Sequence, residues 1–364
     1  MCQYFLTEFE APSSHKEEYM KSRQNDFDSW FDLNTDRLLP NADKDGPILD
    51  FAVVGYPKCG TTTLMANLGK LAPMPLADVC TPVHKTVYYS YKNWPERFGA
   101  TKLLRGTKCP AYISTGTEIN DFSKYVPRTK LIVGIRHPFK WFKSFWNMQA
   151  YRENAVASPY NRTTLCVKKR DRCRDSCPNG QLFCLHRARF HLGLAKLGKT
   201  NLTKEERMLL APNDVDGGMK LKSKNIKNPV FLYEQEELSE DYLWDDLATY
   251  LGVESIPHDA YHGSHGQANK IHAVGFCLDE YDGFRSMIMP YAYELSEWIQ
   301  KYFIPVANDE SKSNVVIPRP DRMAELVENY KVDPCGKLIR FDNGTYALPP
   351  NYDERGDSVV TTSL

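Results

Sequence analysis

The sequence has no excess of either charge. Its 364 residues include 46 Lys and Arg and 46 Asp and Glu, so the formal net charge is zero. A protein that binds nucleic acid or an anionic membrane through general electrostatic attraction usually carries a basic excess. The composition therefore argues against both kinds of partner.

Long apolar runs are also missing. No stretch approaches the roughly 18 apolar residues that a membrane-spanning helix needs. The first 23 residues are polar and include four glutamates, so they lack the pattern of a signal peptide and by themselves predict a cytoplasmic protein. An apolar content of 42% and an aromatic content of 12% are nevertheless ample for a globular core.

The cysteines point to a different compartment. Four of the ten lie close together, as Cys166, Cys173, Cys177 and Cys184, in a basic segment at about 152–190. Their spacing lacks the paired C-x2-C of a structural zinc site. Two local disulfides are the favoured interpretation, with a zinc site and free thiols as the alternatives.

Three glycosylation sequons, at Asn161, Asn201 and Asn343, favour the same compartment as the disulfides. Disulfides and sequons suit the Golgi or another secretory lumen. The N-terminus as given favours the cytoplasm, so both locations stay open.

Short apolar runs alternate with helical patterns along the chain. Nearly continuous runs at 48–55, 130–135 and 230–233 are typical of strands buried on both faces of a parallel sheet. Helical spacing predicts helices at 61–71, 139–151, 240–251 and 290–303. Pro138 suits a first helical residue, Ser239 a cap and Gly252 a helix end.

This alternation predicts an α/β fold with a central, mostly parallel sheet flanked by helices. We expect a polar lead-in over 1–46, one domain over 47–305 and an extended surface tail over 306–364. The Cys-rich segment at 152–190 and a loop at 211–228 have the composition of insertions.

The loop after the first predicted strand has the glycine spacing of a nucleotide triphosphatase but not its lysine. Gly55 and Gly60 have four residues between them, as in G-x4-G-K-[ST], yet Thr61 follows Gly60 and the loop lysine is Lys58. A lysine after the glycine would reach the outer phosphates, and the next hydroxyl would hold magnesium. Neither role can be filled here.

The loop still has the composition of an anion site. The N–H groups of Gly60, Thr61, Thr62 and Thr63 would open the helix, with its positive dipole end towards an anion. The threonine hydroxyls add donors and Lys58 adds a cation. An ordinary tight turn with a surface lysine is the simpler alternative.

The string Tyr-Pro-Lys-Cys-Gly-Thr-Thr-Thr-Leu at 56–64 resembles the 5′-phosphosulfate-binding loop, P-K-[SCG]-G-[ST]-[ST], of sulfotransferases that use 3′-phosphoadenosine 5′-phosphosulfate (PAPS). The resemblance implies a P-loop-like sulfotransferase fold with PAPS as co-substrate. It also implies that Lys58 stabilises the oxygen between phosphate and sulfate. Cys59, Gly60 and the threonines 61–63 would then line the 5′-phosphate site.

A second motif of that family lies about 80 residues further on. Arg136 ends the second predicted strand and Ser144 follows eight residues later in the next helix, as in the element that holds the donor's 3′-phosphate. A guanidinium fork suits a phosphate, and a hydroxyl from the helix would close the site. A surface salt bridge is the alternative for Arg136 alone.

Two weaker similarities extend the resemblance over about Phe51 to Phe303. The segment 106–112 is similar to the K-[ST]-P-x-Y element of carbohydrate sulfotransferases, whose lysine, here Lys108, faces the reaction centre. The segment 231–238 looks like the R-Y-E-D-L element. Both favour the carbohydrate (Golgi-type) branch.

The implied reaction is an in-line displacement at sulfur, without a metal, in which positioning and charge stabilisation lower the barrier. The family's usual catalytic glutamate, some twenty residues beyond the loop, is missing. His84 is our first choice for the base because imidazole titrates near neutrality, and Asp78 is the second. The catalytic set predicted is therefore Lys58, His84 and Lys108.

The acceptor cannot be identified from the sequence. A hydroxyl or amine is required, and the resemblance favours a carbohydrate over a small alcohol or a sterol. Because the glutamate is absent, a non-catalytic nucleotide- or glycan-binding protein on the same fold is the alternative. A nucleotide kinase or triphosphatase comes third.

Overall fold

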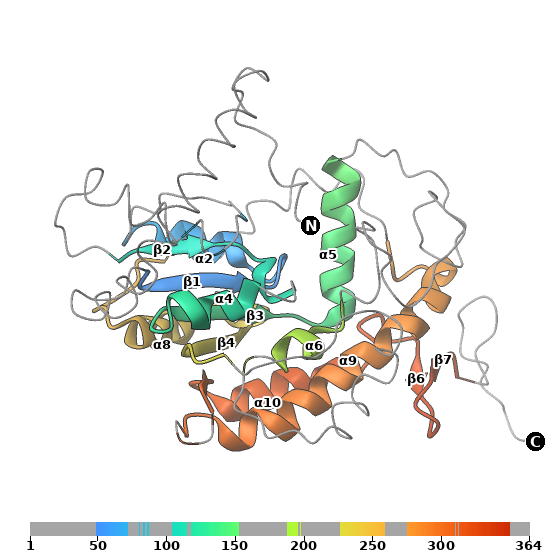
Figure 1. Cartoon of the computed structure of the whole chain (residues 1–364). Coiled ribbons are helices and arrows are strands. Elements are labelled where there is room, and N and C mark those ends of the chain that lie inside the picture. Colours follow the sequence, from blue (N-terminus) through green and yellow to red (C-terminus); the bar gives the residue numbers. More distant parts are fainter. Residues whose placement is uncertain are drawn as a thin grey trace, which may run out of the picture.

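A five-stranded parallel sheet forms the centre of the part of the chain that the computed structural model describes: residues 49–71, 80, 83, 86, 104–114, 118–152, 188–195, 197, 226–258, 275–309, 311 and 313–349. The strand order is β2-β1-β3-β4-β5 (Figure 1), and every neighbouring pair is parallel. The strands are β1 (Phe51–Gly55), β2 (Gly106–Lys108), β3 (Lys130–Ile135), β4 (Val230–Glu234) and β5 (Val315–Val316). The predicted α/β class is confirmed.

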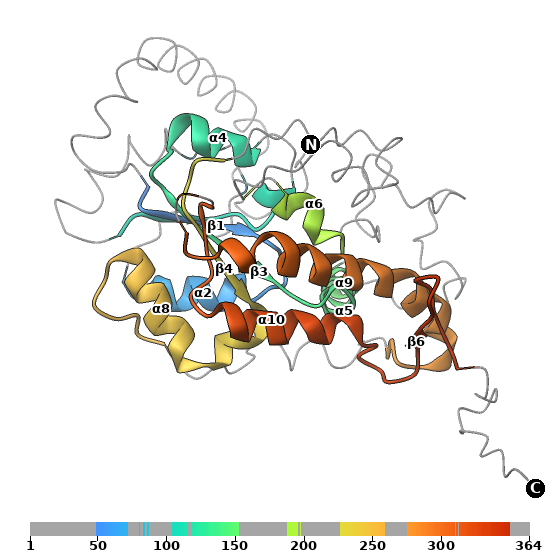
Figure 2. The same cartoon turned by 90° about the horizontal axis from the view of Figure 1, so that it is seen from below.

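Helices cover both faces of this sheet. They are α2 (Thr61–Leu68), α4 (Glu118–Tyr125), α5 (Pro138–Arg152), α6 (Phe190–Leu194), α8 (Asp241–Leu251), α9 (Asp282–Tyr302) and α10 (Pro320–Glu328). Figure 2 shows α2 and α8 together on one side of the strands, α4 on the other, and α9 beside α10. Alternate strand residues supply the two cores: Phe51 and Val53 pack with α2 and α8, while Ala52 and Val54 join the larger core.

Several of the predicted boundaries match the structure, and others differ by a few residues. β3 has the predicted limits, and β1 begins three residues later than predicted, at Phe51. Pro138 is the first residue of α5, where its missing N–H is harmless. Gly252 ends α8 in a left-handed conformation with φ of 78°.

The prediction that Ser239 caps α8 is wrong. Its hydroxyl donates to the carbonyl of Glu236 at 2.9 Å, inside the short 3-10 turn η3 (Gln235–Ser239). Glu240 is the N-cap residue instead, and its side chain makes no cap hydrogen bond in the structure described. Ser239 therefore belongs to the turn before α8 and not to the helix cap.

The last predicted helix begins eight residues earlier than expected, at Asp282, so Pro290 lies inside α9. Proline removes a helical hydrogen bond. Buried side chains on both sides of it, including Ile288 and Leu295, nevertheless keep the helix packed in the larger core. Packing has overridden the local signal.

The chain after residue 306 is not an extended surface tail over 315–347. β5 pairs in parallel with β4, and Met323 and Val327 of α10 are buried in the larger core. After the 3-10 turn η6 (Asn329–Lys331), the strands β6 (Ile339–Arg340) and β7 (Tyr346–Ala347) form a small antiparallel pair. The division of the chain into domains stays a prediction.

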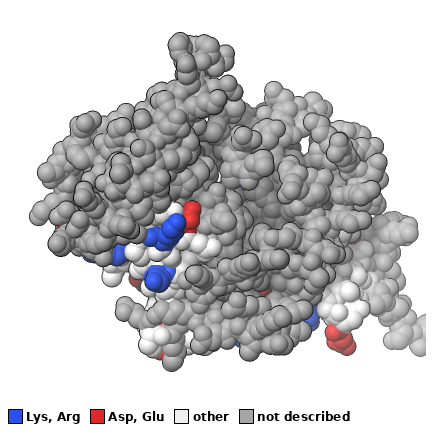
Figure 3. All heavy atoms as spheres, in the orientation of Figure 1, with Lys and Arg blue, Asp and Glu red and all other residues white. Residues whose placement is uncertain are grey.

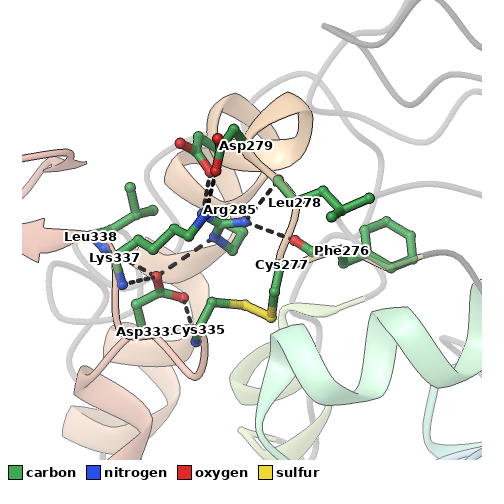
Figure 4. The surroundings of a disulfide bond; sticks show 10 residues. Phe276, Cys277, Leu278, Asp279, Arg285, Asp333, Cys335, Lys337 and Leu338 are labelled. Atoms are coloured by element: carbon green, nitrogen blue, oxygen red, sulfur yellow. Dashed lines mark hydrogen bonds and ion pairs between the residues drawn. A yellow bond between two sulfur atoms is a disulfide. The ribbon is translucent and has the colours of Figure 1, made fainter. Parts of the chain in front are cut away.

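A disulfide joins the segment before α9 to the segment after η6. Cys277 bonds to Cys335, and beside it the buried guanidinium of Arg285 lies 3.6 Å from the buried carboxylate of Asp333 (Figure 4). The Asp333 carboxylate also accepts the N–H of Leu338 at 3.0 Å. The C-terminal segment is thus held by a covalent link and by a buried ion pair.

None of the described helices is long and apolar enough to cross a membrane. On the face drawn in Figure 3, the described basic side chains lie close to an acidic one, so this part of the surface has mixed charge. The four clustered cysteines and most of both predicted insertions lie outside the described residues.

Candidate functional site

The strand order places a topological switch point between β1 and β3. β2 lies on one side of β1 and β3 on the other. The chain therefore leaves β1 towards β2 and leaves β3 towards β4, so the loops that follow these two neighbouring strands lead in opposite directions. In open parallel sheets, ligands bind at such switch points, outside the carboxyl ends of the strands. The loop 56–60 follows β1, and Arg136 follows β3 directly.

The loop has an unusual backbone. Lys58 has φ of 68° and Gly60 has φ of 78°, so two of three consecutive residues are left-handed. A Cβ on Gly60 would lie 1.9 Å from Cδ1 of Leu238, so the position requires glycine both for space and for conformation. Cys59 is fully buried, and burial raises the pKa of its thiol. Its place in the donor site stays a prediction.

The loop leads into the N-terminus of α2. Gly60 is its N-cap, no side chain caps the helix in the described structure, and no acidic residue lies in its first turn. Thr61 is buried, Thr62 is exposed and Thr63 is partly buried. The first N–H groups of a helix lack intrahelical partners, so this end can accept an anion.

Arg136 lies beside this loop. Its Nη1 donates to the carbonyl of Lys58 at 3.2 Å. Its Nε is buried and has no hydrogen-bond partner among the described residues. Ser144 lies partly buried in the second turn of α5, the helix that begins just after Arg136. The Nε of Arg136 is the donor without a described partner, and a buried donor of this kind is expected to meet a ligand.

A buried carboxyl group lies behind the loop, at the end of β4. Glu234 accepts from the hydroxyl of Tyr330 at 2.9 Å and from the N–H of Glu236 at 2.5 Å. Burial raises the pKa of Glu234 to about 7, and it also raises the pKa of Glu237. Near neutral pH, Glu234 therefore changes its charge close to the anion site.

His137 packs against Tyr330, the residue that donates to Glu234. The ring is buried, and its Nδ1 accepts the N–H of Phe139 at 3.1 Å. Its centroid lies 5.1 Å from that of Tyr330. Burial and the nearby charge of Lys140 lower the pKa of His137 to about 3, so the ring is neutral at physiological pH.

Lys108 ends β2, the edge strand next to β1. It pairs in register with Val53, and its side chain is buried. The next residue, Cys109, donates its N–H to the carbonyl of Val53 at 3.0 Å and forms a disulfide with Cys80. The cross-link holds the backbone beside Lys108, whose catalytic role stays a prediction.

The two candidate bases, His84 and Asp78, lie outside the described residues. Near them in the sequence, Val83 is buried in the larger core, and the hydroxyl of Thr86 lies 3.2 Å from that of Tyr112. No group of three or more His, Cys, Asp or Glu residues that could hold a metal occurs in the part of the chain described.

Two disulfides among the described residues, Cys80–Cys109 and Cys277–Cys335, join distant segments, so the clustering of cysteines in the sequence does not indicate them. Both are compatible with a secretory or lumenal location. The sequon Asn343 is exposed in the turn between β6 and β7.

No protein-family model matches the chain, and no curated protein matches its sequence. Among solved structures, it is similar to a sulfotransferase from Alicyclobacillus acidocaldarius, with 14% identity and a TM-score of 0.43. That match covers 69% of this chain and 96% of the bacterial one. A likeness this distant carries no functional argument, so function depends on the site itself.

Proposed function

We propose that this chain is a sulfotransferase that uses PAPS as donor and sulfates a hydroxyl or amine, with a carbohydrate as the favoured acceptor. The observation that carries the proposal is the loop between β1 and α2. Its left-handed Lys58 and Gly60 lie beside Arg136 at the switch point of a parallel sheet. The loop lacks the lysine that a triphosphatase needs after its glycine.

The residues present suit the two phosphate ends of such a donor. The uncapped start of α2, with Thr61, Thr62 and Thr63, would hold the 5′-phosphosulfate. Arg136, whose Nε is buried without a described partner, would hold the 3′-phosphate together with Ser144. PAPS supplies the sulfuryl group.

The chain's own residues would then stabilise charge and remove a proton. Lys58 would neutralise the negative charge that develops on the leaving oxygen, and Lys108 is proposed as a second cation near the reaction centre. His84 is the proposed base for the acceptor's proton, with Asp78 as the alternative.

Binding calorimetry tests the donor assignment. Purified protein should bind adenosine 3′,5′-bisphosphate at least about tenfold more tightly than ATP, because only the former offers a 3′-phosphate to a guanidinium. The affinity should not change when magnesium is replaced by a chelator. Equal affinity for ATP, or a strict need for magnesium, would reject the proposal.

A radiolabelled-PAPS assay over glycan, sterol and phenol acceptors tests the reaction and identifies the acceptor class. Lys58→Ala should lower transfer by about 100-fold or more, the usual cost of removing a group that stabilises developing charge. Lys70→Ala, which changes an exposed lysine just beyond α2, is the matched control and should keep full activity. Full activity in Lys58→Ala would reject the mechanism.

We propose a secretory or Golgi lumen as the location, which the two disulfides support. Mass mapping under non-reducing conditions and glycosidase treatment of the cell-derived protein test this. Reduced cysteines at all four positions, with an unmodified Asn343, would favour the cytoplasm.

A further inference from the structure

Three consecutive carbonyls of the loop accept hydrogen bonds from side chains of three different elements. The donors come from α5, from the end of β3 and from β4, all far away in the sequence. The pairs are Trp141 Nε1 to Pro57 O at 2.5 Å, Arg136 Nη1 to Lys58 O at 3.2 Å and Tyr233 Oη to Cys59 O at 2.6 Å.

These contacts decide which way the peptide groups of the loop point. In a planar trans peptide, the C=O and the following N–H point in opposite directions. When Trp141 holds the carbonyl of Pro57, the N–H of Lys58 is turned to the other side. Tyr233 does the same for the N–H of Gly60 through the carbonyl of Cys59.

The same contacts explain how a lysine can stay left-handed. An L-residue in that conformation is strained, and such strain persists only where the surroundings fix it. Lys58 has bound carbonyls immediately before it and after it, and its own carbonyl is bound to Arg136. Hydrogen bonds to three successive carbonyls therefore fix the backbone at Lys58.

The Tyr233 contact depends on a second feature of the sheet. The Tyr233 side chain is buried and passes over Gly134 of β3. A Cβ on Gly134 would lie 2.3 Å from the Tyr233 hydroxyl and 2.9 Å from the carbonyl of Cys59. A glycine on one strand thus makes room for a tyrosine from the next strand to reach the loop.

We infer that Tyr233 and Trp141 are positioning residues of the donor-binding loop. They hold its carbonyls away from the anion and so direct the N–H groups of Lys58 and Gly60 towards it. The inference depends on the proposed function in one respect, that the anion is the phosphosulfate end of the donor. It otherwise requires only that the loop binds a phosphate-like anion.

Tyr233→Phe tests the inference, with Tyr250→Phe as the matched control. Tyr250 also donates its hydroxyl to a backbone carbonyl, that of Leu131 at 3.2 Å, but within β3 rather than in the loop. Tyr233→Phe should weaken binding of adenosine 3′,5′-bisphosphate about tenfold, the equivalent of one well-placed hydrogen bond. Tyr250→Phe should leave the affinity unchanged.

Kinetics separates positioning from a general loss of structure. In Tyr233→Phe the KM for the donor should rise by about the same tenfold factor, because in the proposed function the loop binds the donor and not the acceptor. The KM for the acceptor should stay constant. If Tyr233→Phe behaves like Tyr250→Phe in both measurements, the inference is overturned. Should Tyr233→Phe fail to fold, Trp141→Phe carries the same test on the carbonyl of Pro57.

The two proposals fail in different ways. If the parent protein binds ATP as well as the bisphosphate, the sulfotransferase proposal fails. The positioning role is then decided by inorganic pyrophosphate, for which Tyr233→Phe should still show the tenfold loss. A parent protein that binds none of these anions would overturn both.

Discussion

Replacing Glu234 by glutamine should change how the stability of the protein depends on pH. Glu234 is buried behind the anion site, and its pKa is about 7 in the folded protein against 4.5 for an ordinary glutamate. Each pH unit of such a difference corresponds to about 1.4 kcal/mol, so the whole effect is about 3 kcal/mol. Glutamine keeps the shape but cannot ionise.

The sign follows from which state ionises first. Below about pH 4.5 the Glu234 carboxyl group is protonated in both the folded and the unfolded chain. As the pH rises towards 7, only the unfolded chain loses this proton, so the free energy of unfolding falls. The contribution is therefore fully present in acid and has been lost slightly above pH 7.

His137 acts in the opposite direction in part of this range. Its pKa is about 3 in the folded protein instead of 6.5, so the free energy of unfolding falls as the pH drops below 6.5. The two effects overlap between about pH 4.5 and 6.5. Only the difference between Glu234→Gln and the parent isolates the carboxyl group.

Urea denaturation at pH 5 and pH 8 measures this difference. Relative to the parent, Glu234→Gln should be about 2.5 kcal/mol more stable at pH 8 than at pH 5, because a small part of the effect is already lost at pH 5, and any constant offset from the lost hydrogen bond cancels in this difference. Glu236→Gln is the control, because that carboxylate is 51% exposed and pairs with Lys140 at the surface. Parallel stability curves for Glu234→Gln and the parent would refute the reasoning.

Two further predictions concern the loop and the C-terminal segment. Lys58→Gly should keep the free energy of unfolding within about 1 kcal/mol of the parent or raise it, because relief of the left-handed strain offsets the entropy cost of glycine. Transfer activity should be lost. Urea titration and the labelled-PAPS assay check both outcomes, and a large loss of stability would contradict the prediction. Replacing Cys277 and Cys335 by serine should lower the free energy of unfolding by about 2–4 kcal/mol through the lost cross-link. Urea denaturation measures this loss, and reductant should destabilise the parent by more than the double variant, because only the parent still has this bond to lose.

Three of the strands, β1, β3 and β4, and the loop after β1 could be predicted because their signals are local. β1, β3 and β4 are almost wholly buried, so each is a nearly continuous apolar run that needs no knowledge of its neighbours. The glycine and lysine spacing of the loop is local too. The sheet order, by contrast, depends on long-range pairing, and β5 is only two residues long.

The C-terminal part was misjudged because its stabilising contacts come from distant segments. Pro, Asn and Asp are typical of surface loops, and these residues are frequent beyond Val306. Yet Tyr330 is buried against Glu234, and a disulfide to Cys277 fixes Cys335. A composition-based argument cannot detect a link of either kind.

In the site, the sequence indicates a residue proposed to touch the donor, Arg136, but not the residues that shape the loop, Trp141 and Tyr233. Arg136 was identified by its spacing from Ser144, which resembles the family's 3′-phosphate element. Trp141 and Tyr233 donate to backbone carbonyls, and a backbone carbonyl has no sequence signature. The only available signals were a buried aromatic at the start of α5 and a tyrosine at the end of β4, and both patterns are equally typical of core residues.

The left-handed lysine is itself an argument for function. Glycine at position 58 would adopt φ of 68° without steric cost, so the backbone conformation gives no reason for a lysine there. The surrounding structure instead supplies three side-chain donors and a glycine at 134 that hold this conformation. Because strain that the surroundings maintain in this way occurs mainly at ligand sites, the side chain of Lys58 is the part of the loop whose presence needs a chemical explanation. A cation at the start of an uncapped helix, beside Arg136, is what the proposed donor-binding role of this loop requires.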